Sequence, residues 1–121
     1  MQYMLLIYND ENAWQALGEA ERGSIVQEYF AFTTGLRESG AFLDGAPLEP
    51  TTASTTVRVR HGEQLVTDGP FAETKEQLGG FYLIEAESLD EAIAHAANVP
   101  GAKYGSIEVR PVAPVTAETA A

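Results

Sequence analysis

The sequence has no cysteine, only two histidines and few basic residues, and each shortage excludes a kind of site. Without cysteine the chain has no disulfide, no thiolate nucleophile and no thiolate metal ligand. With His61 and His95 as its only histidines, a histidine-rich metal site is excluded as well. We therefore expect no metal and no cofactor.

Positive charge is scarce. The chain has 7 Lys and Arg against 18 Asp and Glu, which gives a formal charge of -11 at pH 7. Nucleic acids and anionic membranes are bound through Lys and Arg that neutralise phosphates, and an acidic surface repels them. We expect neither as a partner.

Long apolar runs are missing too. No segment approaches the roughly 20 apolar residues of a transmembrane helix. The apolar run from Tyr3 to Tyr8 is too short for a signal peptide and has no basic flank, so the cytoplasm is the expected location. A chain of 121 residues with 45% hydrophobic residues fits one globular domain with its own core. We predict that this domain spans residues 1–112 and that residues 113–121 form a flexible tail.

Hydrophobic periodicity predicts an alternation of strands and helices. The continuous apolar residues 4–8 predict a central strand that is covered on both faces. The other elements are predicted, in chain order, at residues 19–38 (helix), 41–48 (edge strand), 55–60 and 64–67 (hairpin), 81–86 (strand), 89–98 (helix) and 106–112 (strand). Ser88 and Glu91 form a capping box at the start of the second helix.

Both helices carry apolar stripes that we expect to face a sheet. The stripe of the first helix comprises Ile25, Tyr29, Phe32 and Leu36, widened by Val26, Phe30 and Thr33. The stripe of the second helix comprises Leu89, Ala92, Ile93 and Ala96.

The order of the elements predicts an α+β fold of the ferredoxin-like βαββαβ type with an inserted hairpin, in which two helices cover one face of an antiparallel sheet. The strands carry apolar residues on both faces: Met4 and Leu6, for example, oppose Leu5 and Ile7. One chain supplies helices for one face only, so the other face is expected to meet a second copy. We predict a homodimer.

The densest polar stretch follows the hairpin. Asp68 opens a turn with Gly69 and Pro70, and Glu73, Lys75 and Glu76 come next. In a functional interpretation Lys75 pairs with a carboxylate, while Asp68 or Glu73 faces a cleft as a base or a ligand contact. Alternatively, Asp68 caps the turn, Glu73 and Glu76 begin a helical turn, and Lys75 is solvated.

Two residues outside this loop are further candidates for ligand binding. Tyr29 lies in the apolar stripe of the first helix, and its hydroxyl needs a partner whether it packs in the core or lines a pocket. Arg58 shares one face of the hairpin with Arg60. The pair either binds an anionic group or forms a solvated edge that discourages aggregation.

Four separated motifs resemble the DGPF-domain branch of the YCII-related proteins. They are Tyr3-Met4-Leu5-Leu6-Ile7-Tyr8, the stretch from Asp68-Gly69-Pro70-Phe71 to Leu78-Gly79-Gly80-Phe81-Tyr82, Leu89-Asp90-Glu91-Ala92 and Ile107-Glu108-Val109-Arg110-Pro111. The resemblance covers residues 1–112. It implies a dimeric α+β barrel, in which two ferredoxin-like sheets face one another.

The resemblance also bears on activity. Some YCII-related proteins look like enzymes, including ones that act on chlorinated aromatic rings, and these place a His on the first helix near an Asp after the second. In this chain the two positions fall on Tyr29 and Val99, so the oriented His–Asp base is absent. Other DGPF proteins are associated with extracytoplasmic-function sigma factors, which implies regulation.

Three functional hypotheses follow. The first is a small-molecule-binding protein or modest enzyme with its cleft between the first helix and the sheet, near the 68–76 loop. Its candidate ligand-binding residues, for a small anionic or aromatic ligand, are Tyr29, Arg58, Asp68, Glu73 and Lys75, with Asp68 or Glu73 handling protons. The second is a regulatory or interaction module that acts through its dimer surface, linked to a sigma factor. The third is a purely structural dimer.

Overall fold

The computed structural model describes residues 1–115, and the tail predicted at residues 113–121 lies outside them from residue 116 onward. The elements are β1 (Gln2–Asn9), α1 (Glu11–Ala16), α2 (Glu19–Glu38), β2 (Phe42–Pro47), the 3-10 helix η1 (Thr51–Ala53), β3 (Thr55–Arg60), β4 (Glu63–Asp68), β5 (Gln77–Glu85), α3 (Leu89–Ala97), the 3-10 helix η2 (Pro100–Lys103) and β6 (Ser106–Pro111). Within the described residues, no helix is long and apolar enough to cross a bilayer.

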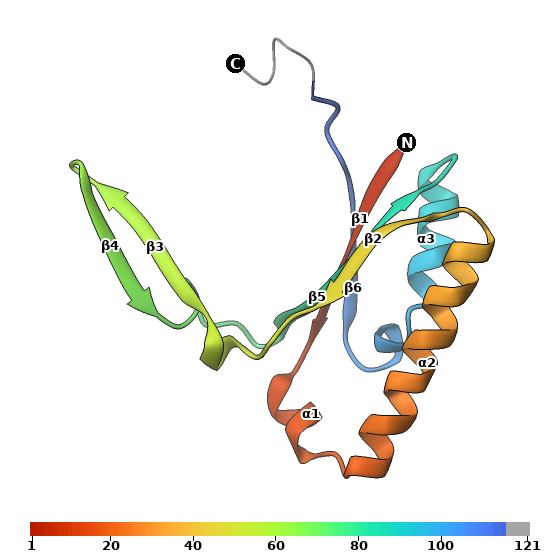
Figure 1. Cartoon of the computed structure of the whole chain (residues 1–121), viewed down its shortest axis with the longest axis horizontal. Helices are drawn as coiled ribbons and strands as arrows, with labels where there is room; N and C mark the ends of the chain where they lie inside the picture. The colour runs from red at the N-terminus through yellow and green to blue at the C-terminus, as the bar shows by residue number, and fades with distance from the viewer. Residues whose placement is uncertain (116–121) are drawn as a thin grey trace.

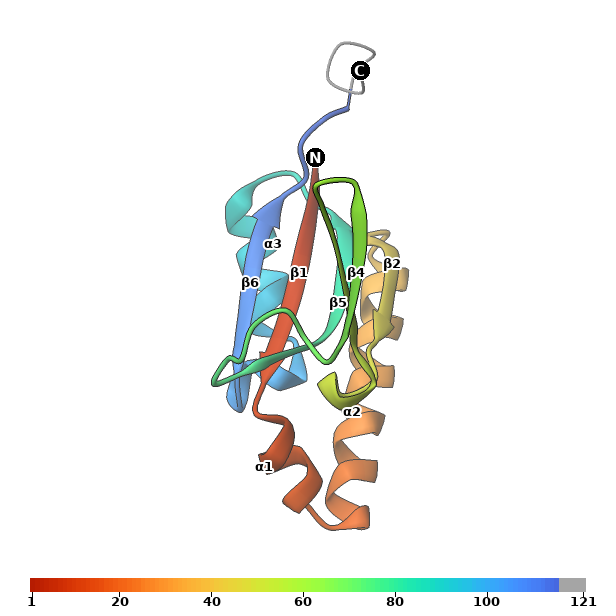
Figure 2. The same cartoon turned by 90° about the vertical axis from the view of Figure 1, so that its left-hand side faces the viewer.

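Four strands form one antiparallel sheet in the order β2-β5-β1-β6. Helices α2 and α3 both lie on one side of it, as Figures 1 and 2 show. Each helix connects two parallel strands that have an antiparallel strand between them, which is the split βαβ connection of a ferredoxin-like fold. The predicted α+β fold class is confirmed. One half of the predicted capping box is present at the second helix, where the Glu91 N–H donates to Ser88 Oγ at 3.2 Å, while the Glu91 carboxylate accepts from the Glu87 N–H at 2.8 Å.

The core lies between the sheet and the helices. Strand β1 contributes Tyr3, Leu5 and Ile7, which are buried, whereas Met4 and Leu6 on its other face stay half-exposed. The strand was expected to be covered on both faces, and one chain covers only one of them. The other core residues are Leu36, Ala41, Tyr82, Ile84, Ala86, Ala92, Ala96 and Val99.

The buried stripes of both helices are narrower than predicted. On α2, Phe30 is 64% exposed and Val26 is 41% exposed, because a helix on a flat sheet buries only one side of its surface. On α3, Ala92 and Ala96 are buried, while Leu89 and Ile93 are about half exposed. The two alanines let α3 approach the sheet closely, which leaves the larger side chains on its flank.

Strand β5 begins at Gln77, four residues before the predicted start at Phe81. The glycine pair lies inside the strand, at a shift in register between Ile7 and Tyr8 of β1. A Cβ on Gly80 would lie 3.0 Å from the Ala46 carbonyl oxygen, and one on Gly79 would lie 2.9 Å from Asn9 Oδ1. These glycines therefore permit close backbone approach at a bulge rather than releasing the chain from a loop.

Strands β3 and β4 form the predicted hairpin, and they make a two-stranded sheet of their own. The hairpin projects on the side of the main sheet that has no helices (Figures 1 and 2). Its tip is closed by His61 and Gly62, whose φ angles of 52° and 78° suit a tight hairpin turn. Every residue from 57 to 68 is exposed.

Candidate functional site

The predicted site residues do not converge within one chain. Arg58 and Asp68 lie on the hairpin, and Glu73 and Lys75 lie in the loop that follows it; all four are exposed. Tyr29 is on α2, on the opposite side of the main sheet (Figure 1). The single cleft that was expected to join these five residues is not formed inside the chain.

The 68–76 loop is held mainly through backbone groups. The Gly69 N–H donates to the Ser54 carbonyl at 2.7 Å, and Thr56 Oγ1 donates to the Gly69 carbonyl at 2.8 Å. Across residues 1–115 no ion pair involves Asp68, Glu73 or Lys75, and no helical turn forms in the loop. The structure thus shows neither the ion pair of the functional interpretation nor the helical turn of the alternative.

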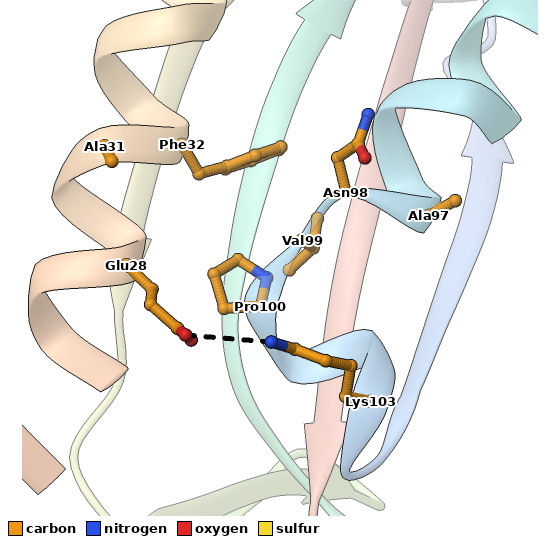
Figure 3. Close-up of a pocket in the computed structure, with 8 residues that line it drawn as sticks. All are labelled: Glu28, Ala31, Phe32, Ala97, Asn98, Val99, Pro100 and Lys103. Carbon is orange, nitrogen blue, oxygen red and sulfur yellow. Dashed lines mark ion pairs between the residues drawn. The ribbon is translucent and has the colours of Figure 1, made fainter. Parts of the chain in front are cut away.

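A groove lies instead between α2 and the segment that follows α3. It has a volume of about 570 Å³ and is open to solvent along one side. Its lining residues, drawn in Figure 3, are Glu28, Ala31, Phe32, Ala97, Asn98, Val99, Pro100 and Lys103. We call it the α2–η2 groove. Its walls are mostly apolar, with three polar side chains among them.

An ion pair crosses one end of the α2–η2 groove. Lys103 Nζ on η2 lies 3.7 Å from Glu28 Oε1 on α2 (Figure 3). The side chains are 63% and 42% exposed, so the pair contributes little to stability and can open at low cost. Val99 and Pro100 are buried and form the wall of the groove opposite α2. The groove therefore combines a rigid apolar wall with one adjustable pair of opposite charges.

Tyr29 ties the two walls of the groove together. Its Oη accepts a hydrogen bond from the Gly101 N–H at 3.1 Å. Burial raises the pKa of Tyr29 to about 12, although this hydrogen bond opposes the rise. The hydroxyl therefore stays protonated at neutral pH and is a poor general base. A Cβ on Gly101 would lie 2.6 Å from Tyr29 Oη, so glycine leaves the space that this contact needs.

A second polar contact lies under α2. Thr33 Oγ1 donates to the Tyr29 carbonyl at 2.9 Å and lies 2.8 Å from Tyr82 Oη, which leaves the Tyr82 hydroxyl as the donor in that bond. Burial raises the pKa of Tyr82. The ring of Tyr82 also packs edge-on against Phe32, with centroids 5.2 Å apart. Phe32, which lines the groove, is thereby held in place from below.

Sequence reasoning identified Tyr29 and the Val99 position but missed the groove itself. Glu28, Asn98 and Lys103 stand in no motif, and α2 and η2 are far apart along the chain. The one sequence pattern beside the groove was the Pro100-Gly101 pair after α3, and it indicated only the end of that helix. Residues 1–115 contain no group of three or more His, Asp or Glu placed to hold a metal ion.

Comparisons with known proteins agree with this fold. The family model for the YCII-related domain matches residues 1–116. An uncharacterised protein of Rhizobium meliloti (strain 1021) is 46% identical over 115 residues, which are 93% of each chain. Among solved structures, the 5-chloro-2-hydroxyhydroquinone dehydrochlorinase TftG of Burkholderia phenoliruptrix AC1100, in complex with 2,5-dihydroxybenzoquinone, superposes with a TM-score of 0.55. That match has 19% identity and covers 93% of this chain and 94% of the other, so it supports the fold alone. The chain belongs to the YCII-related family.

Proposed function

We propose that this protein binds a small aromatic molecule with an anionic group in the α2–η2 groove. The observation that carries the proposal is the groove itself: about 570 Å³, with apolar walls and a Glu28–Lys103 pair at one end. Small-molecule sites are typically clefts of about 300–1,000 Å³ with mostly apolar lining and a few polar groups. Phe32 and Pro100 would contact the ring, and Lys103 would bind the anionic group.

Binding is better supported than acid–base catalysis. The tyrosine beside the groove has a pKa of about 12, and its oxygen already accepts the Gly101 hydrogen bond. The Val99 side chain, which lines the groove, is apolar and buried. The positions that carry His and Asp in enzyme-like relatives are thus used for structure in this chain. The proposed binding site is therefore the α2–η2 groove and not the 68–76 loop.

Calorimetric titration with two probes tests this proposal. The probes are benzoate, as a simple aromatic acid, and 2,5-dihydroxybenzoquinone, the ligand present in the structure of the dehydrochlorinase. We expect saturable binding that weakens about tenfold in Lys103→Met, because a hydrogen bond to a charged group contributes about 1.5–3 kcal/mol and exposure reduces this value.

Lys75→Met is the matched control, because it removes an exposed lysine from the 68–76 loop. It should leave the affinity unchanged. Binding that Lys75→Met weakens and Lys103→Met does not would place the site at the loop and contradict the groove. Absence of saturable binding by both probes would contradict this ligand class.

We also propose that the protein is a homodimer formed through the helix-free face of the main sheet. The half-exposed Met4 and Leu6 of β1 pair with Leu83 and Phe81 of β5, so four apolar side chains form a continuous patch at the centre of this face. Charged residues of the neighbouring strands surround it: Asp44 pairs with Leu83, and Glu108 pairs with Leu6. An apolar centre with a polar rim is the usual composition of an oligomer interface.

Sedimentation velocity of Leu6→Lys tests the dimer. A lysine at the centre of the patch should give a monomer at concentrations where the parent is a dimer, because it would place a charge in the apolar interface. Leu89→Lys on α3, which is 50% exposed on the helix side, is the control and should remain dimeric. A parent chain that sediments as a monomer throughout would contradict the proposal.

A further inference from the structure

We propose that the β3–β4 hairpin is an arm that clasps the second copy of the chain. We call residues 55–68 the arm, and Val57, Val59 and Val66 its valine face. The inference rests on the proposed homodimer and adds a second contact to it, between the valine face of each copy and the body of the other.

The valine face is an apolar surface that no part of residues 1–115 covers. Val57 pairs with Val66, and Val59 pairs with Gln64, so the three valines project from the same side of the hairpin. They are 59%, 57% and 61% exposed for Val57, Val66 and Val59. Exposing three adjacent β-branched side chains to water is unfavourable in free energy, and burying them against another protein surface removes this cost.

Across residues 1–115, the arm is a two-stranded sheet by itself. It shares no strand pairing with the main sheet, and an isolated two-stranded hairpin is at best marginally stable in water. Its ends are nevertheless well defined. The His61–Gly62 turn closes the tip, and the Gly69–Ser54 hydrogen bond of 2.7 Å closes the root. A structure that is ordered locally but lacks packing is suited to contact with a partner.

The position of the arm points to a second copy as that partner. The arm projects on the helix-free side of the main sheet (Figures 1 and 2). The apolar patch of Met4, Leu6, Phe81 and Leu83 lies on the same side of that sheet. A second copy packed on the patch would lie on that side, beside the arm. Because a two-fold interface uses the same surfaces in both copies, each arm would reach the body of the other.

The extent of the surface favours the same partner. A specific dimer interface usually contains about 20–30 residues on each side. The helix-free face presents only every second residue of four short strands, which is fewer residues than such an interface contains. The two six-residue strands of the arm add to this number. A dimer of this chain is therefore of usual size only with the arm included.

Charge is consistent with this arrangement. Arg58 and Arg60, on the face opposite the valines, are two of the 7 basic residues in a chain with 18 acidic ones. The arm also contains Glu63 and Asp68, so its net charge is close to zero. An arm without net charge approaches an acidic body with less repulsion than a negatively charged segment would meet.

Analytical ultracentrifugation over a concentration series tests the arm. The variant is the full chain with Val57→Thr, Val59→Thr and Val66→Thr, which keeps β-branched side chains and thus the strand preference of the hairpin. We expect its dimer dissociation constant to rise at least about tenfold, because apolar contact area is lost. Val26→Thr, the same substitution at an exposed valine of α2, is the control and should leave the constant unchanged.

Hydrogen exchange of the unmodified chain supplies a readout that does not depend on the variant. Arm amides should exchange more slowly well above the dissociation constant than well below it. Three results together would overturn the arm alone and leave the proposed dimer intact. Leu6→Lys would disrupt the dimer, the valine substitutions would leave the dimer dissociation constant unchanged, and exchange of the arm amides would not depend on concentration. A parent that stays monomeric would overturn both the arm and the proposed dimer.

Discussion

The Tyr29 hydroxyl oxygen accepts a hydrogen bond from the Gly101 N–H, 72 residues further along the chain. This hydrogen bond connects α2 with η2, the two elements that form the walls of the groove. Tyr29 also stands at the position where the resemblance to enzyme-like family members implies a histidine. Its oxygen is committed to a backbone donor and its pKa lies far above neutrality, so the contact determines the shape of the groove rather than its proton chemistry.

Replacing Tyr29 with phenylalanine should destabilise the protein. The ring would remain, but the partly buried Gly101 N–H would lose its acceptor, and an unsatisfied buried group costs about 1–3 kcal/mol. Urea denaturation should show this loss as a lower midpoint with an unchanged m value. Tyr104→Phe is the control, because Tyr104 is 61% exposed, and its midpoint should match that of the parent. Equal midpoints for all three proteins would contradict a structural role for the bond.

Stability should fall at high pH in a way that depends on Tyr29. The pKa of Tyr29 is about 12 in the folded chain and about 10 when unfolded, so between these values the folded chain binds more protons. The stabilisation is fully present below pH 10 and is lost as the pH rises through 12. Denaturation midpoints across this range should decline less steeply in Tyr29→Phe than in the parent. The same slope in both would show that other groups cause the decline.

Local patterns predicted most of the fold. Apolar spacing from Ile25 to Leu36 predicted helix α2, because a sheet-facing helix must repeat its apolar residues at about 3.6 positions, and the predicted bounds of 19–38 are the observed ones. Met4 and Leu5 are both apolar although they point to opposite faces of their strand. This pattern correctly indicated a strand of which one chain covers only one face. The hairpin followed from alternation around the His61–Gly62 turn. Each of these features is determined by neighbours in sequence.

The candidate site was less accessible to such reasoning. Polar density drew attention to the loop with Asp68 and Lys75, yet in one chain these side chains are exposed and lie away from Tyr29. The α2–η2 groove combines Glu28 with Lys103 only because the fold places η2 beside α2. A groove formed by two distant segments leaves no local pattern, since each of its residues is ordinary in its own segment.

Two glycine-to-alanine substitutions should change stability in opposite directions. A Cβ on Gly105 would lie 2.1 Å from the Tyr8 carbonyl oxygen, so Gly105→Ala forces the backbone of β1 or its neighbour to move. Gly35 lies inside α2 with nothing within 4 Å of its Cβ position, and Gly35→Ala should stabilise by about 0.5–1 kcal/mol. Thermal melts should rise for Gly35→Ala and fall for Gly105→Ala by several degrees. A neutral Gly105→Ala would mean that the junction before β6 is looser than the structure shows.

Glu11 should be a determinant of where the arm points. Its carboxylate accepts from the Thr51 N–H at 2.7 Å and from Thr51 Oγ1 at 2.8 Å, and its own N–H donates to Gln77 Oε1 at 3.0 Å. Thr51 begins η1, directly before the arm, and Gln77 begins β5, after the loop by which the chain returns from it. Glu11 thus connects both ends of the segment that contains the arm, through its carboxylate at Thr51 and through its backbone N–H at Gln77.

Glu11→Ala should therefore lower the unfolding free energy by about 1–3 kcal/mol, because it removes two partly buried hydrogen bonds to a charged acceptor. Hydrogen exchange should accelerate first at η1 and the root of the arm, while amides of β1 stay protected, since the core does not depend on this contact. Glu21→Ala is the matched control: it removes the same charge from the first turn of α2, where no described side-chain hydrogen bond involves Glu21. If the two variants exchanged alike at the root, the hydrogen bonds of Glu11 would not fix the arm, and its direction would have to be set by contacts in the dimer instead.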